Sequence, residues 1–164
     1  MTIQNVAVLG AGIMGRGIAY ASALGGLRTV LEDSSGEAVD KATAEISALR
    51  EKGGATGKVQ GEDAAAAHQR LTTARSLEDA VRGADLVIEA VPEDIDLKVE
   101  LFSALDRLAR PHAVLASNTS SLSITEMAAA TRRPGQVVGM HFFNPVHRMR
   151  LLEVVRALET SEET

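Results

Sequence analysis

The sequence predicts an α/β fold, namely a doubly wound, mostly parallel sheet with helices on both faces. Three observations favour this fold. Short apolar segments alternate with segments of helical periodicity along the 164 residues, which is typical of a parallel sheet. Residues 85–91 are nearly all apolar, as expected of a strand covered by helices on both sides. The first apolar segment, residues 3–9, runs directly into a glycine-rich turn.

The N-terminal half begins with a strand over residues 3–9, because this apolar run ends at a glycine. The helix expected over 13–24 is closed by a pair of glycines. A second strand over 27–32 and a helix over 37–52 follow. Residues 53–61 contain four glycines, which predicts a mobile loop or a break between two helices.

The C-terminal half contains the most periodic helix, expected over 94–110 and stopped by Pro111. Its helical spacing is carried by Leu97, Leu101, Leu105 and Leu108. A shorter helix is expected over 124–130. The apolar segments expected to form the remaining strands are 71–73, 85–91, 113–116, 136–140 and 151–155. Residues 159–164 resemble a cap that leads into another helix.

Composition excludes several kinds of function. The chain has no cysteine, so disulfides, thiolate metal sites and cysteine nucleophiles are absent, and we expect no metal site. With 17 basic and 22 acidic residues the net charge is −5, which disfavours a nucleic-acid partner. No apolar run approaches the roughly 20 residues that span a bilayer, and the N-terminus carries no basic leader. We therefore expect a cytoplasmic protein without a membrane partner.

The pattern Gly-x-Gly-x-x-Gly occupies residues 10–15, between the first strand and the first helix. In this context Gly10 permits the tight turn, Gly12 lets a pyrophosphate approach the backbone, and Gly15 lets helix and strand pack closely. The helix N-terminus offers unpaired N–H groups to the phosphates. The turn therefore predicts a dinucleotide cofactor and a sheet of the Rossmann type.

The second strand ends in Glu32-Asp33, close to the expected distance of about 20 residues beyond the last glycine. A carboxylate there accepts hydrogen bonds from ribose hydroxyls and repels a 2′-phosphate, which favours NAD over NADP. Either residue is a candidate, and we favour Asp33 because it lies at the end of the strand. The alternative is a glycine turn followed by an ordinary acidic residue.

Polar residues follow three later strands, at 91–93 with Lys98 nearby, at 117–120 and at 141–145. Ligands of open parallel sheets bind beyond the carboxyl ends of the strands, so these groups are expected to meet near the nicotinamide end of the cofactor. The alternative is that Glu93 and Lys98 are surface charges of a helix and that the serines are capping residues.

His141 is the strongest candidate for a catalytic base, because histidine exchanges protons near neutral pH. Glu153 lies within the apolar run 151–155. A buried carboxylate is costly without a partner, so we expect Glu153 to pair with His141 and to orient it. His68 and His112 have polar or alanine-rich surroundings and are expected at the surface.

The segments GAGIMGRGIA (10–19), ASNTSS (116–121) and GMHFFNPV (139–146) closely resemble the 3-hydroxyacyl-CoA dehydrogenase family. The resemblance covers essentially the whole chain as one NAD-binding domain, 1–164. Residues 147–149 look most like the multifunctional fatty-acid oxidation members. Members of the family continue into a helical domain that closes over the acyl chain and forms the dimer, and that domain is absent from these 164 residues.

The resemblance implies that His141 is the catalytic base, that Glu153 is its partner, and that Ser120 and Asn144 lie near substrate and nicotinamide. The turn, the strand ends and the resemblance together assign cofactor binding to Gly10, Gly12, Ile13, Met14, Gly15, Asp33, Val91, Pro92, Glu93, Lys98, Ser120 and Asn144. Contacts to the coenzyme A phosphates are harder to place, with Lys52 and Lys58 as candidates.

The expected function is NAD-dependent oxidation of (S)-3-hydroxyacyl-CoA to 3-oxoacyl-CoA, with this chain as the half that holds the cofactor and His141. A first alternative is an isolated NAD-binding module without turnover of its own. A second is a relative that acts on a free 3-hydroxy acid or a nucleotide sugar, since fold does not determine function. The full-length protein is expected to be a homodimer.

Overall fold

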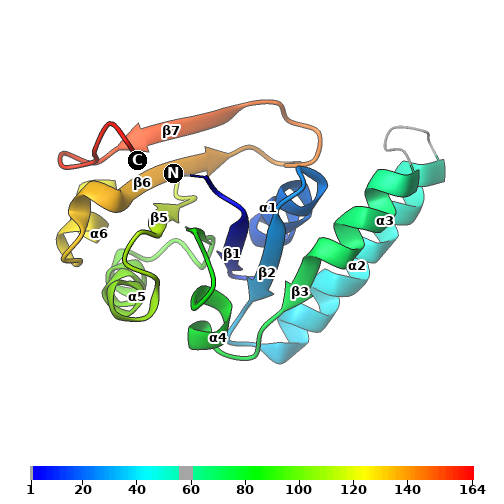
Figure 1. Ribbon diagram of the computed structural model, residues 1–164, viewed down its shortest axis with the longest axis horizontal. Helices are drawn as coiled ribbons and strands as arrows, with labels where there is room; N and C mark the ends of the chain where they lie inside the picture. The colour runs from blue at the N-terminus through cyan, green and yellow to red at the C-terminus, as the bar shows by residue number, and fades with distance from the viewer. Residues whose placement is uncertain (1, 56–60) are drawn as a thin grey trace.

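The computed structural model describes residues 2–55 and 61–164 and shows one seven-stranded sheet in the order β3-β2-β1-β4-β5-β6-β7 (Figure 1). The strands are β1 (Asn5–Leu9), β2 (Arg28–Glu32), β3 (Leu71–Thr73), β4 (Leu86–Glu89), β5 (Val114–Ser117), β6 (Val137–Phe142) and β7 (Leu152–Arg156). The helices are α1 (Ile13–Leu24), α2 (Gly36–Ala55), α3 (Gly61–Arg70), α4 (Leu77–Val81), α5 (Ile95–Leu108) and α6 (Ile124–Ala129), with the 3₁₀ turn η1 (Pro134–Gln136) before β6.

The direction of the strands confirms the predicted doubly wound sheet. Strands β1 to β6 are all parallel to one another, and β7 runs antiparallel to β6. Strands β2 and β3 are added on one side of β1. Strands β4 to β7 are then added on its other side. The strand order therefore reverses between β1 and β4, and the crevice at such a point is where sheets of this kind bind their ligands.

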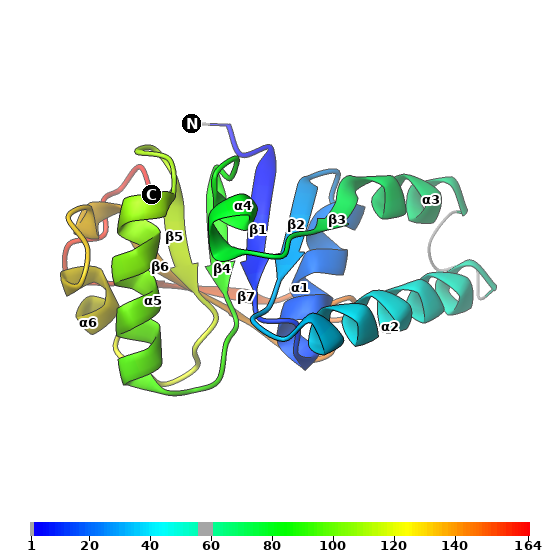
Figure 2. The ribbon, with the colours of Figure 1, turned by 90° about the horizontal axis from the view of Figure 1, so that it is seen from below.

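Two apolar cores cover the two faces of the sheet. In β1 the alternating side chains divide between them, since Val6 and Val8 belong to one core and Ala7 and Leu9 to the other. Helices α1 and α2 close the first core, while α4, α5 and α6 close the second (Figure 2). Burial on both faces explains why these strands read as continuous apolar runs.

Several elements differ from the sequence prediction. Helix α2 continues to Ala55, helix α3 agrees with the alternative of a second helix after the glycine-rich segment, and helix α4 was not predicted. Of the predicted loop over 53–61, residues 56–60 lie outside the described residues. The strand expected over 136–140 is shifted, because η1 takes up Gln136 and the ladder to β7 extends to Phe142. His141 therefore lies within β6 and not beyond its end.

Three of the four predicted leucines of helix α5 pack against the second core, with Leu105 buried and Leu101 and Leu108 partly buried. Leu97 is 41% exposed, whereas Phe102 and Leu105 are fully buried. Lys98 shares this buried face and is only 1% exposed. A buried ammonium is costly unless it is paired, so the burial of Lys98 implies charged partners beneath the helix.

Candidate functional site

The glycine turn has the geometry of a phosphate cradle. Gly10 has a φ of +97°, and its N–H donates to the Glu32 carbonyl at 2.8 Å. A Cβ at Gly15 would overlap the carbonyl oxygen of Gly10, so no larger residue fits. Gly12 is the N-cap of α1, and a Cβ there would meet nothing within 4 Å. The backbone of Gly12 is therefore open to a ligand at the positive end of the helix.

Asp33 is joined directly to this turn. Its Oδ2 accepts the Ala11 N–H at 2.7 Å, and its Oδ1 accepts the Ser35 N–H at 2.8 Å. Asp33 borders a cavity of about 540 Å³, here called the glycine-turn cavity. Glu32 is buried, and burial followed by the charge of Asp33 raises its pKa. Of the two candidates for the ribose, the structure thus brings Asp33 to the turn.

A second cavity, of about 350 Å³, lies further along the carboxyl edge of the sheet, and we call it the His141 cavity. It collects the predicted groups Met14, Val91, Glu93, Lys98, Ser120, His141 and Asn144. Met14, Ala90 and Val91 border both cavities. A dinucleotide can therefore extend from Asp33 across the strand-order reversal to His141, which fits NAD.

His141 and Glu153 form the predicted pair, with Nδ1 and Oε2 2.8 Å apart. The cause is strand register, because the two residues stand directly opposite in the antiparallel β6–β7 ladder. The expected burial of Glu153 is wrong. Its side chain is 54% exposed, against 21% for His141, because β7 is an edge strand. The contact engages Nδ1, and among the described residues Nε2 has no hydrogen-bond partner.

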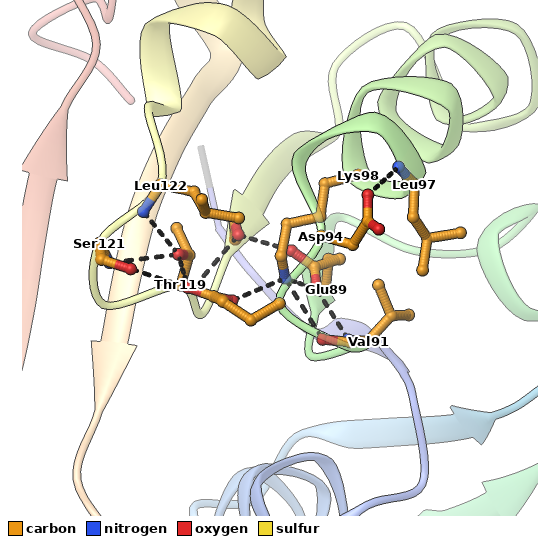
Figure 3. Close-up of polar contacts among 10 residues, drawn as sticks. Glu89, Val91, Asp94, Leu97, Lys98, Thr119, Ser121 and Leu122 are labelled. Carbon is orange, nitrogen blue, oxygen red and sulfur yellow. Dashed lines mark hydrogen bonds and ion pairs between the residues drawn. The ribbon is translucent and has the colours of Figure 1, made fainter.

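A buried network lies beneath the His141 cavity (Figure 3). The Glu89 carboxylate, 0% exposed, forms an ion pair with Lys98 Nζ at 2.5 Å. It also accepts the Ser117 hydroxyl at 2.5 Å and the Val91 N–H at 2.7 Å. Lys98 donates in addition to the Val91 carbonyl at 3.3 Å. These bonds join the ends of β4 and β5 to α5, and they explain why a lysine is buried on that helix.

Glu93 is the carboxylate of this region that reaches the cavity. It accepts hydrogen bonds from the hydroxyls of Thr119 and Ser121, and its Oε2 lies 3.4 Å from Lys98 Nζ. Burial alone would raise the pKa of Glu93, but the hydrogen bond from Thr119 and the charge of Lys98 outweigh it and lower that pKa. Glu93 is therefore ionised at neutral pH.

The loop after β6 is positioned by contacts with two other elements. Asn118 Oδ1 accepts the Phe142 N–H at 3.0 Å, which joins the last residue of β6, where this loop begins, to the segment after β5. Val146 is buried against Gly17 of α1, after a cis bond between Asn144 and Pro145. The exposed Asn144 is thereby placed on the wall of the His141 cavity.

Sequence reasoning missed Glu89, whereas Asn118 and Thr119 belong to the polar segment 117–120 that was expected at the site. Glu89 carried a usable signal, since it is a single carboxylate within an apolar strand. His68 and His112 are exposed, as predicted. Lys52 and Lys58, the candidates for coenzyme A phosphates, lie outside the described side chains.

Within residues 2–55 and 61–164, no helix is long and apolar enough to cross a membrane. Within the same ranges, histidines and carboxylates form no group of three suited to a metal ion.

Comparison with known proteins agrees with the geometry. A family model described as "3-hydroxyacyl-CoA dehydrogenase, NAD binding domain" matches residues 5–164. A probable 3-hydroxybutyryl-CoA dehydrogenase of Bacillus subtilis is 44% identical over 164 residues, which is 100% of this chain and 57% of that protein. The fatty acid oxidation complex subunit alpha of Idiomarina loihiensis is 43% identical over 99% of this chain and 22% of its own length.

Among solved structures, the 3-hydroxybutyryl-CoA dehydrogenase of Escherichia coli K12 superimposes with a TM-score of 0.96 at 40% identity. The match covers 99% of this chain and 34% of the other. The chain therefore spans between about a fifth and somewhat more than half of the length of these relatives.

Proposed function

The chain belongs to the 3-hydroxyacyl-CoA dehydrogenase family as its NAD-binding domain, and from this premise we propose that it forms one half of an oxidoreductase. This half holds NAD and the catalytic histidine, and the reaction converts (S)-3-hydroxyacyl-CoA to 3-oxoacyl-CoA. The observation that carries the proposal is the His141–Glu153 pair, 2.8 Å apart, at a cavity that shares three lining residues with the glycine-turn cavity.

The glycine turn and Asp33 would hold NAD, which would supply the acceptor for the hydride of the carbon that bears the hydroxyl. His141 removes the hydroxyl proton through Nε2, because Nδ1 is held by Glu153. The Glu153 carboxylate keeps the ring oriented and stabilises the imidazolium that forms. A positioned base of this kind contributes about 10²–10⁴-fold to the rate.

Ser120 and Asn144 line the same cavity as His141, and both are exposed to a ligand. We assign them to the polar groups of substrate and nicotinamide, which their hydroxyl and amide can bind as donor or acceptor. Both lie outside the β-strands, on segments that the buried Thr119 and Val146 anchor. Rigid anchors of this kind hold the side chains in the positions that the reaction requires.

The alternative is an NAD-binding module without turnover, and one experiment separates the two. NAD is titrated into the 164-residue chain by calorimetry, and the same sample is assayed for oxidation of 3-hydroxybutyryl-CoA. The enzyme is supported if the wild-type chain turns the substrate over and the His141→Ala variant loses turnover but still binds NAD. Substitution of the exposed His68 by alanine is the control and is expected to change neither NAD binding nor turnover.

Binding without turnover by the wild-type chain favours the module, and failure to bind NAD contradicts both functions. An acyl-CoA substrate and a homodimer of the longer protein belong to this proposal, as does the absence of nucleic-acid and membrane partners. The cytoplasmic location stays a prediction.

A further inference from the structure

Three charged groups meet at the floor of the His141 cavity. Glu89 and Lys98 are 0% and 1% exposed, whereas the side chain of Glu93 is 43% exposed. Lys98 Nζ lies between the two carboxylates, 2.5 Å from Glu89 and 3.4 Å from Glu93. We call these three residues the Glu89–Lys98–Glu93 cluster. Figure 3 shows Lys98 directed from α5 toward Glu89 and the Val91 backbone.

The cluster carries one uncompensated negative charge, since two carboxylates face one ammonium. Among the described residues that line the His141 cavity, Glu93 and Lys98 alone have a fixed charge. The remaining titratable group on the lining is His141, whose Nδ1 is bound to the Glu153 carboxylate. The opposite wall therefore supplies no fixed cation that would cancel the charge of the cluster.

The cluster is also rigidly held. Glu89 accepts hydrogen bonds from Ser117 and Val91, and Glu93 accepts them from Thr119 and Ser121. Charges that are buried and held in place act on a ligand more strongly than charges that water can screen, and Glu89 and Lys98 are both buried. The negative charge is thus a permanent property of this cavity.

The two redox forms of the cofactor differ at one place. The oxidised nicotinamide ring carries a positive charge, and the ring that has accepted a hydride is neutral. Hydride transfer must occur beside the base, so the ring belongs in the His141 cavity while the adenosine half lies by Asp33. A negative cavity stabilises the cationic ring and does little for the neutral one.

We propose that the Glu89–Lys98–Glu93 cluster sets the relative affinity for oxidised and reduced cofactor through its net charge, with Glu89 as a positioning residue that acts through Lys98. The proposal rests on the proposed function only for the placement of nicotinamide in the His141 cavity. At separations of several ångströms near a protein surface, one unit charge changes such an affinity ratio by about tenfold.

The experiment measures the dissociation constants of NAD⁺ and NADH for the 164-residue chain by calorimetry at pH 8. Glu93→Gln and Glu89→Gln each remove one negative charge and leave the cluster neutral. The double variant Glu89→Gln/Lys98→Met removes one charge of each sign and keeps the net charge at its original value. NAD⁺ and NADH share every other group, so a loss of structure weakens both and leaves their ratio unchanged.

The matched control is Asp106→Asn, which removes a buried carboxylate that is ion-paired with Arg132 and Arg133. We expect each neutral-cluster variant to weaken NAD⁺ relative to NADH by about tenfold. The double variant and the control are expected to keep the wild-type ratio.

Glu93→Gln keeps the test valid if loss of the buried Glu89 charge prevents folding, because Glu93 is partly exposed. A folded Glu93→Gln variant with an unchanged ratio would overturn this inference alone. A wild-type chain that binds neither cofactor would overturn the proposed function as well.

Discussion

At the scale of single residues, Asp33 connects cofactor choice to the glycine turn. Each of its oxygens already accepts one backbone N–H, from Ala11 and from Ser35. A carboxylate has about four acceptor sites, so each oxygen keeps one for a ribose hydroxyl. The same negative charge repels a 2′-phosphate.

Asp33→Ala is therefore expected to weaken NAD about 10–100-fold, since hydrogen bonds to a charged group contribute about 1.5–3 kcal/mol. The affinity for NADP is expected to fall less, because the substitution also removes the repulsion between Asp33 and the 2′-phosphate. Calorimetric titration with each cofactor measures both effects. Asp40→Ala removes an exposed carboxylate of α2 and is the control. Equal affinity of the wild-type chain for NAD and NADP would contradict this interpretation of Asp33.

Glu153 and Glu89 show how far residue-level prediction from sequence reaches. Each is a carboxylate within an apolar strand, and this pattern correctly predicted the partner of Glu153 but not its exposure. The same pattern at Glu89 marks a fully buried ion pair. The sequence does not tell an edge strand from a central one, because exposure depends on which elements pack beside the strand.

At the scale of elements, Asp85 joins two strands at the edge opposite the cofactor. Its Oδ2 accepts the N–H groups of Gln4 and Asn5 and the Asn5 side-chain amide, at 2.9–3.0 Å. Its Oδ1 lies 3.3 Å from His112 Nε2. Burial raises the pKa of Asp85, but these hydrogen bonds outweigh that effect and lower the pKa to about 2.

Asp85 should therefore stabilise the fold in a pH-dependent way. Its folded pKa of about 2 lies below the ordinary value of 3.8, so the stabilisation is complete above pH 4 and is lost as pH falls toward 2. The two pKa values correspond to about 2 kcal/mol. Urea unfolding should show that the difference in free energy of unfolding between wild type and Asp85→Asn becomes smaller by this amount from pH 5 to pH 2. A difference in free energy of unfolding that stays constant over this range would show that protonation of Asp85 does not affect stability.

Gly17 offers a second test, at the contact between α1 and the loop after β6. A Cβ at Gly17 would lie 3.0 Å from Val146 Cγ2 and 3.2 Å from Val146 Cβ. Alanine at a helical glycine gains about 1 kcal/mol, and this crowding opposes the gain. We expect Gly17→Ala to stabilise the Val146→Ala variant by about 0.5–1 kcal/mol and the wild type by less. Urea unfolding measures the change in stability. If Gly17→Ala changed the stability of the wild type and of Val146→Ala equally, crowding against Val146 would be excluded.

The elements differ in how well the sequence predicts them. The strand, turn and helix around Gly10 and Gly15 were predicted because glycine geometry and apolar runs agree there. Helix α4 was missed because five residues are too short for a periodic signal. Its start was nevertheless marked, since Ser76 caps the N–H of Asp79 three residues later.

At the scale of the whole molecule, the two edges of the sheet are unequal. Strand β7 forms one edge, and all five of its residues are exposed. Its large apolar side chains include Leu152, Val154 and Val155, at 37%, 63% and 45% exposure. Figure 1 shows β7 crossing the top of the molecule with no helix above it. An exposed edge strand with apolar side chains favours pairing with another chain.

Val154→Lys is expected to reduce self-association of the 164-residue chain, because a charge on an edge strand opposes pairing. Sedimentation velocity over a concentration series measures the effect, with thermal unfolding to show that the fold is kept. Val154 is 63% exposed, so its replacement removes little buried area and should change stability by less than about 0.5 kcal/mol. Leu97→Lys, at an exposed apolar residue of α5, is the control and should not change association. If both variants associate as the wild type does, the contact lies elsewhere and β7 is not the surface that pairs.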